Sequence, residues 1–214
     1  MRTLTAFFRL RFNIFANWCV ENDRLMVNPF AGLSKANEKA DRRHVRRAMT
    51  ESELCRLLVV ARQRPLVDAM TIRRGKRKGQ VAGKVRDDVR ERLEWLGRER
   101  ALIYKTLVLT GLRKGELAAL RVNQLQFDDS HPHIVLNAAD EKNREGNSIP
   151  LRQDMADDLR KWLSDRQEKD TKLTLRLSDA PRPADDSLAM SPVFVVPNAL
   201  VKILKRDLKA AGIG

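Results

Sequence analysis

The sequence predicts a mainly helical α+β fold that contains one small antiparallel sheet. Apolar residues recur at helical spacing over most of the chain, as in amphipathic helices that pack on a core. Between residues 124 and 151 the pattern becomes alternating, which predicts three short strands joined by two turns. Hydrophobic residues make up 43% of the chain, enough to build a core, so wholesale disorder is not expected.

Residues 3–26 are predicted to form one long helix or two short ones, ending near the break at Asn28-Pro29. One or two amphipathic helices cannot bury their own apolar face, so residues 1–32 are predicted to be the last part of a helical domain. The segment is basic and amphipathic, but no small-residue cleavage site follows it. We therefore do not expect a secretory signal peptide.

Residues 33–49 are predicted to be a basic linker, because they hold few large apolar side chains and six Lys or Arg against two acids. The sequence Thr50-Glu-Ser-Glu53 is a capping box, and it predicts a helix over 51–63. This helix marks the start of a second domain, which we expect to run over residues 50–214.

Residues 71–86 contain seven Lys or Arg, three glycines and no acid. We predict a mobile basic loop here, within a basic insert of about 71–100. A solvated loop that only aids solubility is one interpretation. In a strongly basic protein, contact with phosphates is the interpretation that we favour.

The remaining elements follow from the change of period along the chain. They are helices at 87–97, 101–109 and 113–122; strands at 124–127, 133–139 and 147–151; a helix at 153–167; a loop at 179–187; a short strand or turn at 193–196; and a last helix at 198–211.

The charge of the chain indicates a polyanionic partner. The chain has 42 Lys and Arg against 28 Asp and Glu, which gives a formal net charge of +14. Such an excess favours nucleic acid first and an acidic membrane surface second. Two distant cysteines indicate a reducing, cytosolic compartment. No apolar run is long enough to cross a bilayer. His131 and His133 match no metal spacing, so neither metal nor cofactor is expected.

The stretch TGLRKGELAAL, residues 110–120, places Arg113 at the start of a helix. A cation there is unfavourable unless an anion meets it, because the helix dipole is already positive at that end. Glu116 lies three residues on and can contact Arg113, while Leu117 and Leu120 anchor the helix in the core. A guanidinium held in this way fits two phosphate oxygens. The plainer interpretation is an exposed Arg–Glu pair that contributes well under about 1 kcal/mol.

These residues, followed by the strands, K-x7-P-L and a helix, resemble the catalytic domain of the tyrosine recombinases, also called phage integrases. FANWCVENDRLMVNPF resembles the end of that family's helical core-binding domain, and RRAMTESELCRLL resembles the start of its catalytic domain. VFVVP and LKRDLKAAGI resemble the stretch before its second catalytic box. The resemblance implies an integrase-type helical domain that exchanges DNA strands through a 3′-phosphotyrosine, without a cofactor, for a mobile genetic element.

The resemblance also implies roles for residues. Arg113 would hold the scissile phosphate, Glu116 would orient Arg113, and Lys142 would be the general acid, with Arg144 as the alternative. Asn147 stands where the family usually has a basic residue, so one phosphate contact is missing or supplied elsewhere. We expect contacts with double-stranded DNA from Arg42, Arg43, Arg46, Arg47, Arg73, Arg74, Lys76, Arg77, Lys78, Lys84, Lys114 and Arg144.

The family's nucleophilic tyrosine and its His-x-x-Arg box are expected after the first box. The one tyrosine, Tyr104, precedes Arg113 within an apolar helix, and we interpret it as a core residue. His44 to Arg47 spell His-x-x-Arg, but they lie in the linker and are interpreted as a DNA-backbone contact. We therefore expect a fragment, truncated at both ends, that binds DNA without cutting it.

Members of the family act as tetramers on DNA. We expect this chain to be a monomer in solution and to lie in the cytoplasm with the nucleoid. The alternative is a non-catalytic DNA-binding module of the same fold that regulates or competes with a complete recombinase. A protein that binds RNA or ribosomes by charge alone would leave the arrangement of Arg113, Glu116 and Lys142 unexplained.

Overall fold

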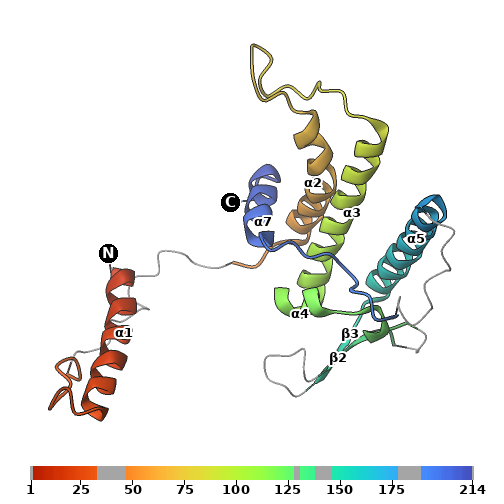
Figure 1. The fold of residues 1–214 in the computed structure, drawn as a ribbon. Coiled ribbons are helices and arrows are strands. Elements are labelled where there is room, and N and C mark those ends of the chain that lie inside the picture. The colour runs from red at the N-terminus through yellow and green to blue at the C-terminus, as the bar shows by residue number, and fades with distance from the viewer. Residues whose placement is uncertain (1, 33–46, 128–130, 138–145, 178–188, 214) are drawn as a thin grey trace. The chain divides into compact units, whose positions relative to one another are not determined.

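The computed structural model describes residues 2–32, 47–127, 131–137, 146–177 and 189–213 (Figure 1). Contacts between residues divide the chain into two units, Met1–Ala48 and Met49–Gly214. The first unit contains one helix, α1 (Arg2–Glu21), among its described residues. The segment after α1 folds back on it, because the Asn28 amide donates to Oδ1 of Asn13 at 2.6 Å.

The predicted helix over 3–26 ends earlier, at Glu21. The turn that follows satisfies its last carbonyls: the backbone N–H groups of Arg24 and Leu25 both donate to the carbonyl of Cys19. Asp23 adopts a positive φ of 56° in this turn, a conformation that aspartate tolerates better than most residues.

The second unit contains five described α-helices and one sheet, which confirms the predicted α+β, mainly α fold. In chain order the elements are α2 (Glu51–Met70), α3 (Asp87–Thr110), α4 (Lys114–Ala119), a 3-10 turn (Val122–Gln124), β1 (Leu125–Gln126), β2 (His133–Leu136), β3 (Asn147–Pro150), α5 (Gln153–Leu177) and α7 (Leu200–Ala210). The sheet is antiparallel with the order β1-β2-β3, as predicted.

The start of α2 confirms the predicted capping box. The Glu53 N–H donates to Thr50 Oγ1 at 3.2 Å, and the Thr50 N–H donates to Glu53 Oε2 at 2.9 Å. The helix continues past the predicted end at residue 63 to Met70, with Pro65 buried inside it. Burial of Leu57, Ala61 and Pro65 on one face of α2 outweighs the hydrogen bond that proline removes.

Helices α2 and α3 form an antiparallel pair that runs through the second unit (Figure 1). The predicted helices at 87–97 and 101–109 are one helix, α3, which passes through Gly97 without a break. A Cβ atom at Gly97 would lie 1.9 Å from the carbonyl oxygen of Arg62 on α2. Glycine therefore serves here to bring the two helices close together and not to end one of them.

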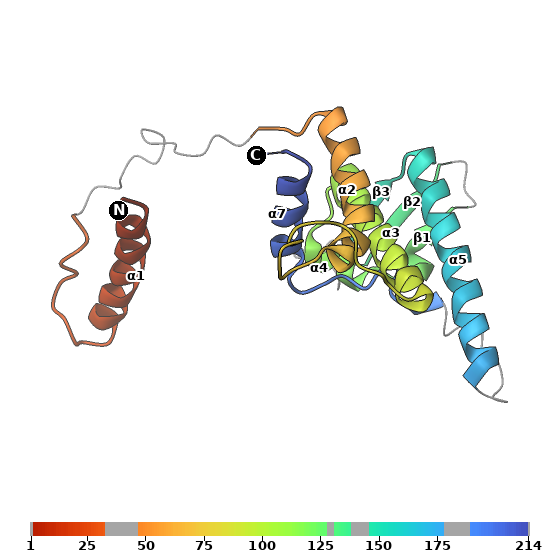
Figure 2. The same ribbon diagram turned by 90° about the horizontal axis from the view of Figure 1, so that it is seen from above.

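The sheet pairs Leu125 with Ile134, and Ile134 with Ile149. The strands are shorter than predicted, but their alternation is as expected, with Ile134 and Leu136 buried. Trp162 of α5 lies at the centre of the core, with its ring centroid 4.5 Å from that of Trp95. Helices α3 and α5 lie against each other here (Figure 2).

The segment before α7 is extended and is not a strand, apart from one isolated bridge between Arg121 and Pro192. The Val193 N–H donates to the carbonyl of Leu120, and the Trp162 indole N–H donates to the carbonyl of Val193. The predicted helix 113–122 is shorter than expected because Val193 takes the carbonyl of Leu120, just beyond the end of α4 at Ala119.

Candidate functional site

The candidate site is the corner between α3 and α4. Helix α3 ends at Gly111, which adopts a φ of 70°, and its N–H donates to the carbonyl of Leu107. This left-handed conformation favours glycine and lets the chain turn sharply. Leu112 is buried beside it, so the turn is anchored before Arg113 begins α4 as the N-cap residue.

Glu116 holds Arg113 by two contacts. Its Oε2 accepts the backbone N–H of Arg113 at 2.8 Å, and its Oε1 accepts Nη1 of the guanidinium at 2.8 Å. The predicted contact between these residues is therefore present. The backbone N–H and then the guanidinium of Arg113 lower the pKa of Glu116 below its usual range, against the opposing effect of burial.

The two partners differ in exposure. The side chain of Arg113 is 61% exposed, whereas that of Glu116 is 10% exposed. Among the described residues, Nε and Nη2 of Arg113 have no hydrogen-bond partner. A buried carboxylate thus fixes one nitrogen of the guanidinium, while the other N–H groups face solvent. Such a fork can bind two oxygens of a phosphate.

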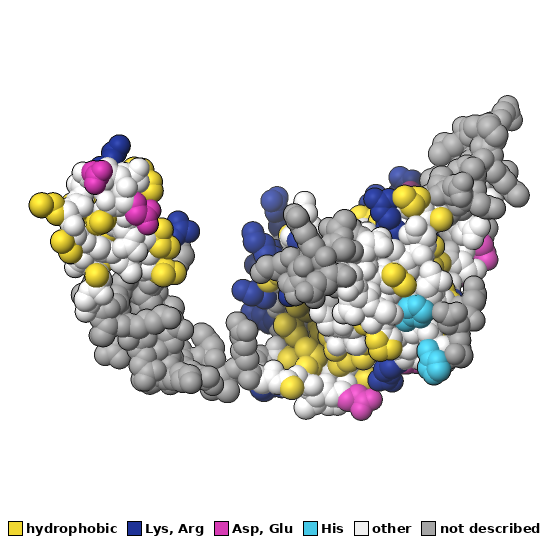
Figure 3. Space-filling view, turned by 90° about the horizontal axis from the view of Figure 1, so that it is seen from below, with side chains coloured by type: hydrophobic (Ala, Val, Ile, Leu, Met, Phe, Trp, Pro, Cys, Tyr) yellow, Lys and Arg dark blue, Asp and Glu magenta, His cyan; other side chains and the backbone are white. Residues whose placement is uncertain are grey.

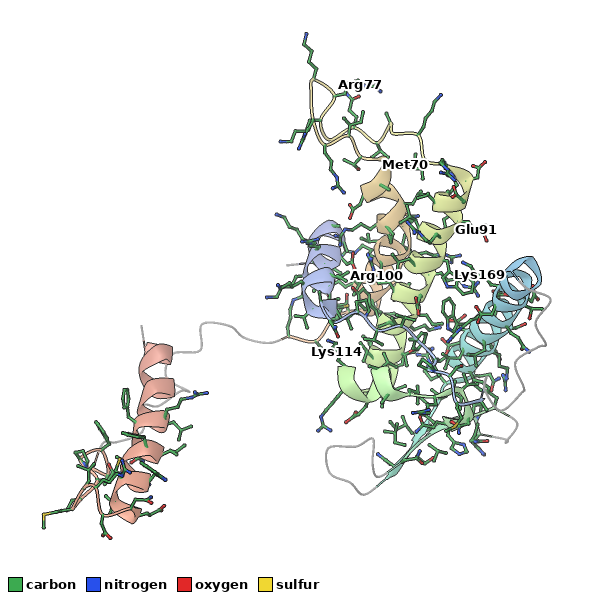
Figure 4. All side chains as sticks on the ribbon, viewed as in Figure 1. Met70, Arg77, Glu91, Arg100, Lys114 and Lys169 are labelled. Carbon is green, nitrogen blue, oxygen red and sulfur yellow. The ribbon has the colours of Figure 1, made fainter. Side chains whose placement is uncertain are left out.

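Contacts from distant parts of the chain hold α4 in place. Leu117 and Leu120 are buried, as predicted. The Lys114 ammonium donates to the carbonyl of Asn198 at 2.8 Å, which ties α4 to the segment before α7. Figure 4 shows Lys114 near one end of the pair formed by α2 and α3. Lys114 keeps two further N–H donors beyond this contact.

Several predicted residues lie outside the described residues, namely Arg42, Arg43, Arg46, Lys142 and Arg144. Lys142 and Arg144 belong to the segment that joins β2 to β3. The convergence of Arg113 and Lys142 therefore remains a prediction. Asn147, the first residue of β3, is exposed.

The other predicted contact residues are on the surface. Arg47, Arg73, Arg74, Lys76, Arg77, Lys78 and Lys84 are all exposed. Except for Arg47, they lie in the segment between α2 and α3, at the end of that pair opposite to α4 (Figures 1 and 4). The structure thus places these six cations far from Arg113.

Tyr104 is a core residue, as predicted. It is 2% exposed, and its hydroxyl donates to Oδ2 of Asp207 at 2.7 Å. Burial, followed by this hydrogen bond and the charge of Asp207, raises the pKa of Tyr104 well above its ordinary value. A phenol in this environment has no access to a phosphate and resists ionisation.

Sequence reasoning missed the buried charged cluster around Asp207. Arg64 of α2 forms an ion pair with Asp207, Arg100 of α3 lies 3.7 Å from the same carboxylate, and Tyr104 donates to it. An acid on the otherwise apolar face of α7 was the available signal. The partners are more than a hundred residues away in the chain, so no local pattern identified them.

A second missed group is Glu99 on α3, which is buried and accepts the Val195 N–H at 2.7 Å. Burial raises the pKa of Glu99, while the Val195 N–H and the charge of Arg166 oppose this effect. Glu99 therefore helps to hold the extended segment before α7. The same segment is also held by the hydrogen bond from the Val193 N–H to the carbonyl of Leu120.

A groove of about 560 Å³ lies among α2, α3 and α5, and its lining does not include Arg113. Its lining mixes apolar and charged side chains, and it includes the ion pairs of Lys105 with Asp154 and Asp158 at 3.0 and 2.6 Å. These pairs join α3 to α5, which is a structural role.

The described residues give no sign of a metal site: no group of three or more His, Cys, Asp or Glu within them is arranged to hold an ion. His131 and His133 lie at the surface, in cyan in Figure 3, and Nδ1 of His133 is 3.0 Å from the carbonyl of His131. Within the same residues, no helix has the length and apolar character needed to cross a membrane.

Comparison with known proteins agrees with the resemblance seen in the sequence. Residues 94–187 match the model of the phage integrase family. No curated protein and no solved structure matches the chain. The matched range contains Arg113, Glu116 and all three strands. This segment is therefore similar to the phage integrase family of tyrosine recombinases, and the similarity supports a role in site-specific recombination.

Proposed function

We propose that this chain binds double-stranded DNA and that Arg113 holds the phosphate at which the family cleaves a strand. The observation that carries the proposal is the half-exposed guanidinium of Arg113, fixed by the buried Glu116 within the matched segment. A preorganised cation next to the reacting phosphate stabilises the negative charge that develops on its oxygens.

The proposed reaction uses residues in separate roles. A tyrosine attacks the phosphorus and forms a 3′-phosphotyrosine, and the 5′-oxygen leaves with a proton from a general acid. Lys142 is the proposed acid, and Arg144 is the alternative. Glu116 positions Arg113 and does not touch the substrate. Arg42, Arg43, Arg46, Arg47, Lys84, Lys114 and the cations at residues 73–78 supply further phosphate contacts.

The chain itself supplies no suitable nucleophile, because its single tyrosine is buried against Asp207. We therefore expect salt-sensitive DNA binding without cleavage. The test is a nicked suicide duplex, which traps a phosphotyrosine by letting the 5′ fragment diffuse away. Retarded but non-covalent complexes are expected, and a covalent adduct would show that the assignment of Tyr104 to the core is mistaken.

A test of Lys142 as the general acid needs a protein that can cleave DNA. In a fusion that supplies the family's His-x-x-Arg and tyrosine box after Gly214, Lys142→Ala should reduce cleavage about 100-fold or more. A 5′-thiol leaving group needs no proton and should restore the rate. Arg144→Ala is the matched control and should show neither effect. Rescue in the Arg144 variant alone would move the acid role to Arg144.

The second candidate function is a DNA-binding module that competes with a complete recombinase. The observation behind it is the set of exposed cations at residues 73–78, which can bind DNA without any catalytic group. An excess of the chain should then inhibit a recombinase that binds the same site. We propose that the chain is a monomer in solution and that complete proteins form tetramers on DNA, which light scattering with and without duplex would test.

A further inference from the structure

Residues 71–81 form a hairpin, and residues 82–86 connect it to α3; the whole segment is called here the basic hairpin. The Ile72 N–H donates to the carbonyl of Gln80 at 2.9 Å, and the Gly79 N–H donates to the carbonyl of Ile72 at 2.8 Å. Thr71 and Val81 form a bridge at its base. Gly75 and Gly79 have φ angles of 83° and 87°, which glycine adopts without strain. The segment thus has a defined fold.

The hairpin is also fixed to α2. The N–H groups of Ala82 and Gly83 both donate to the carbonyl of Met70, the last residue of α2. A Cβ atom at Gly83 would lie 2.9 Å from that carbonyl oxygen, so the close approach needs glycine. Figure 4 shows Met70 at the base of the hairpin and Arg77 near its tip.

The tip presents cations that the rest of the described chain leaves unpaired. Arg73, Arg74, Lys76 and Lys78 are exposed, and none has an ion-pair partner among the described residues. Arg77 donates to the Gln80 side chain at 3.0 Å, which is a neutral contact. By contrast, Lys105 and Arg166 on the helices each face a carboxylate. Mutual repulsion at the tip is relieved by a bound polyanion.

The tip favours a nucleic-acid backbone over a membrane surface. Residues 73–79 contain Arg, Lys and Gly only, so the tip has no apolar side chain to insert between lipids. Flexible cations on a narrow hairpin can follow a phosphate backbone without reading bases.

The distance from Arg113 decides where the hairpin meets DNA. The hairpin precedes the first residue of α3, and Arg113 follows the C-terminal cap of α3. The helix has 24 residues, which at about 1.5 Å per residue is about 36 Å. The hairpin projects beyond the first residue of α3, so its tip lies farther than this from Arg113 (Figure 4). One turn of B-DNA is about 34–36 Å and about ten base pairs long, so the separation exceeds one turn.

We infer that the basic hairpin binds the backbone of the duplex more than one helical turn from the phosphate that Arg113 holds. This inference rests on the proposed function of Arg113. A duplex laid along α3 would contact both ends of the helix, with the hairpin supplying affinity and Arg113 acting at the reacting phosphate.

The first test measures the salt dependence of binding to a random-sequence duplex of about 40 base pairs, which is about four turns and spans a separation of more than one turn with duplex to spare on either side. The hairpin variant is Arg73→Gln, Arg74→Gln, Lys76→Gln and Lys78→Gln. The slope of log Kd against log salt should fall by about 2 to 4, at ~0.9 per lost phosphate contact. Each protein is also offered to vesicles of acidic phospholipid.

The matched control removes the same charge from four scattered, exposed cations. These are Arg56, Arg62, Arg92 and Lys161, which have no ion-pair partner among the described residues. Changed together to Gln, they should alter the slope by less than half as much. Equal slopes for the two variants would overturn the inference, as would hairpin-dependent binding to vesicles but not to DNA.

The second test measures spacing. The variants Lys76→Cys and Ala118→Cys, in a Cys55→Ser background, are labelled with DNA-cleaving iron chelates. The doubly labelled chain should release fragments of one preferred length, longer than about ten nucleotides, from any duplex, since both tethers act in one complex. Singly labelled chains are the control. Fragments of about ten nucleotides or fewer, or without a preferred length, would overturn this placement.

The two tests also separate this inference from the proposed function. A wild-type slope in the hairpin variant, with cleavage by the fusion still dependent on Arg113, defeats the inference alone. Cleavage that is independent of Arg113, with the hairpin effect intact, defeats the proposed role of Arg113 and leaves the hairpin as a DNA contact. Failure of the wild-type chain to bind duplex defeats both.

Discussion

Two arginine–carboxylate pairs in the second unit have opposite exposure. In the pair of Arg113 and Glu116, the arginine side chain is 61% exposed and the acid 10%. In the pair of Arg64 and Asp207, the arginine is 13% exposed and the acid 0%. Both carboxylates are buried, so the difference lies in the cations.

The difference in exposure separates a pair that stabilises the fold from a pair that leaves its arginine available to a ligand. Asp207 receives Arg64, Arg100 and the Tyr104 hydroxyl, which satisfies its oxygens and ties α7 to α2 and α3. Glu116 uses its two oxygens on one residue and leaves the outer face of that guanidinium in solvent. The first pair stabilises the fold, and the second aims a cation at something outside the chain. Figure 3 shows further Lys and Arg side chains gathered along one edge of the same unit.

The largest expected effect is on stability, at the pair of Arg64 and Asp207, called here the sealed pair; the pair of Arg113 and Glu116 is called the open pair. Asp207→Ala leaves Arg100 and the Tyr104 hydroxyl without this acceptor and Arg64 with Asp68 as its remaining carboxylate, and the free energy of unfolding should fall by about 3–5 kcal/mol. Urea unfolding followed by circular dichroism measures it. Arg113→Ala, the same kind of deletion at the open pair, should cost less than about 1 kcal/mol. Similar losses in the two variants would erase the distinction.

The next effect is on chemistry at the open pair. In the fusion that can cleave, Arg113→Ala should slow strand cleavage by about 100- to 1000-fold, because the developing charge on phosphate loses its cation. Affinity for duplex should change by less than about tenfold, since many other contacts remain. Single-turnover cleavage and Kd are both measured. Arg113→Lys keeps the charge without the fork and should restore only part of the rate. Full activity of Arg113→Ala would refute its role.

A smaller effect is expected at Glu116. Glu116→Gln keeps one acceptor oxygen where two are used, so Arg113 loses one of its two contacts, and cleavage should fall by about tenfold. Since the pKa of Glu116 is lowered in the folded state, its contribution to stability is complete above the unfolded value of 4.5 and is lost as pH falls through the folded pKa. Plots of the free energy of unfolding against pH for the wild type and Glu116→Gln should therefore converge at acid pH. Curves that stay apart there would contradict this coupling.

The smallest effect concerns Glu99, a buried acid outside both pairs. Its pKa is raised, so the folded state binds the proton more tightly, and stability falls as pH rises from 4.5 to the folded pKa. Glu99→Gln keeps an oxygen for the Val195 N–H and removes the charge. At pH 7 the variant should match or exceed the wild type by about 1 kcal/mol. Thermal unfolding from pH 4 to pH 8 tests this, and parallel curves would contradict it.

Local patterns in the sequence predicted the parts of the fold that neighbours along the chain decide. The capping box at Thr50 and the contact between Arg113 and Glu116 join residues three apart, so their spacing alone predicted them. The alternating apolar residues predicted the sheet in the same way, because side chains on one strand face have a period of two.

Other features depend on residues that are far apart in the sequence. The path of α2 through Pro65, the passage of α3 through Gly97 and the cluster at Asp207 all contradict or escape local rules. Burial against a second helix outweighs the local preference of proline and glycine, and it makes an acid on an apolar face acceptable once two arginines meet it. By itself the sequence determined which residues carry the candidate chemistry. Only the tertiary structure decided which cations are sealed and which face solvent, because exposure depends on packing between distant segments.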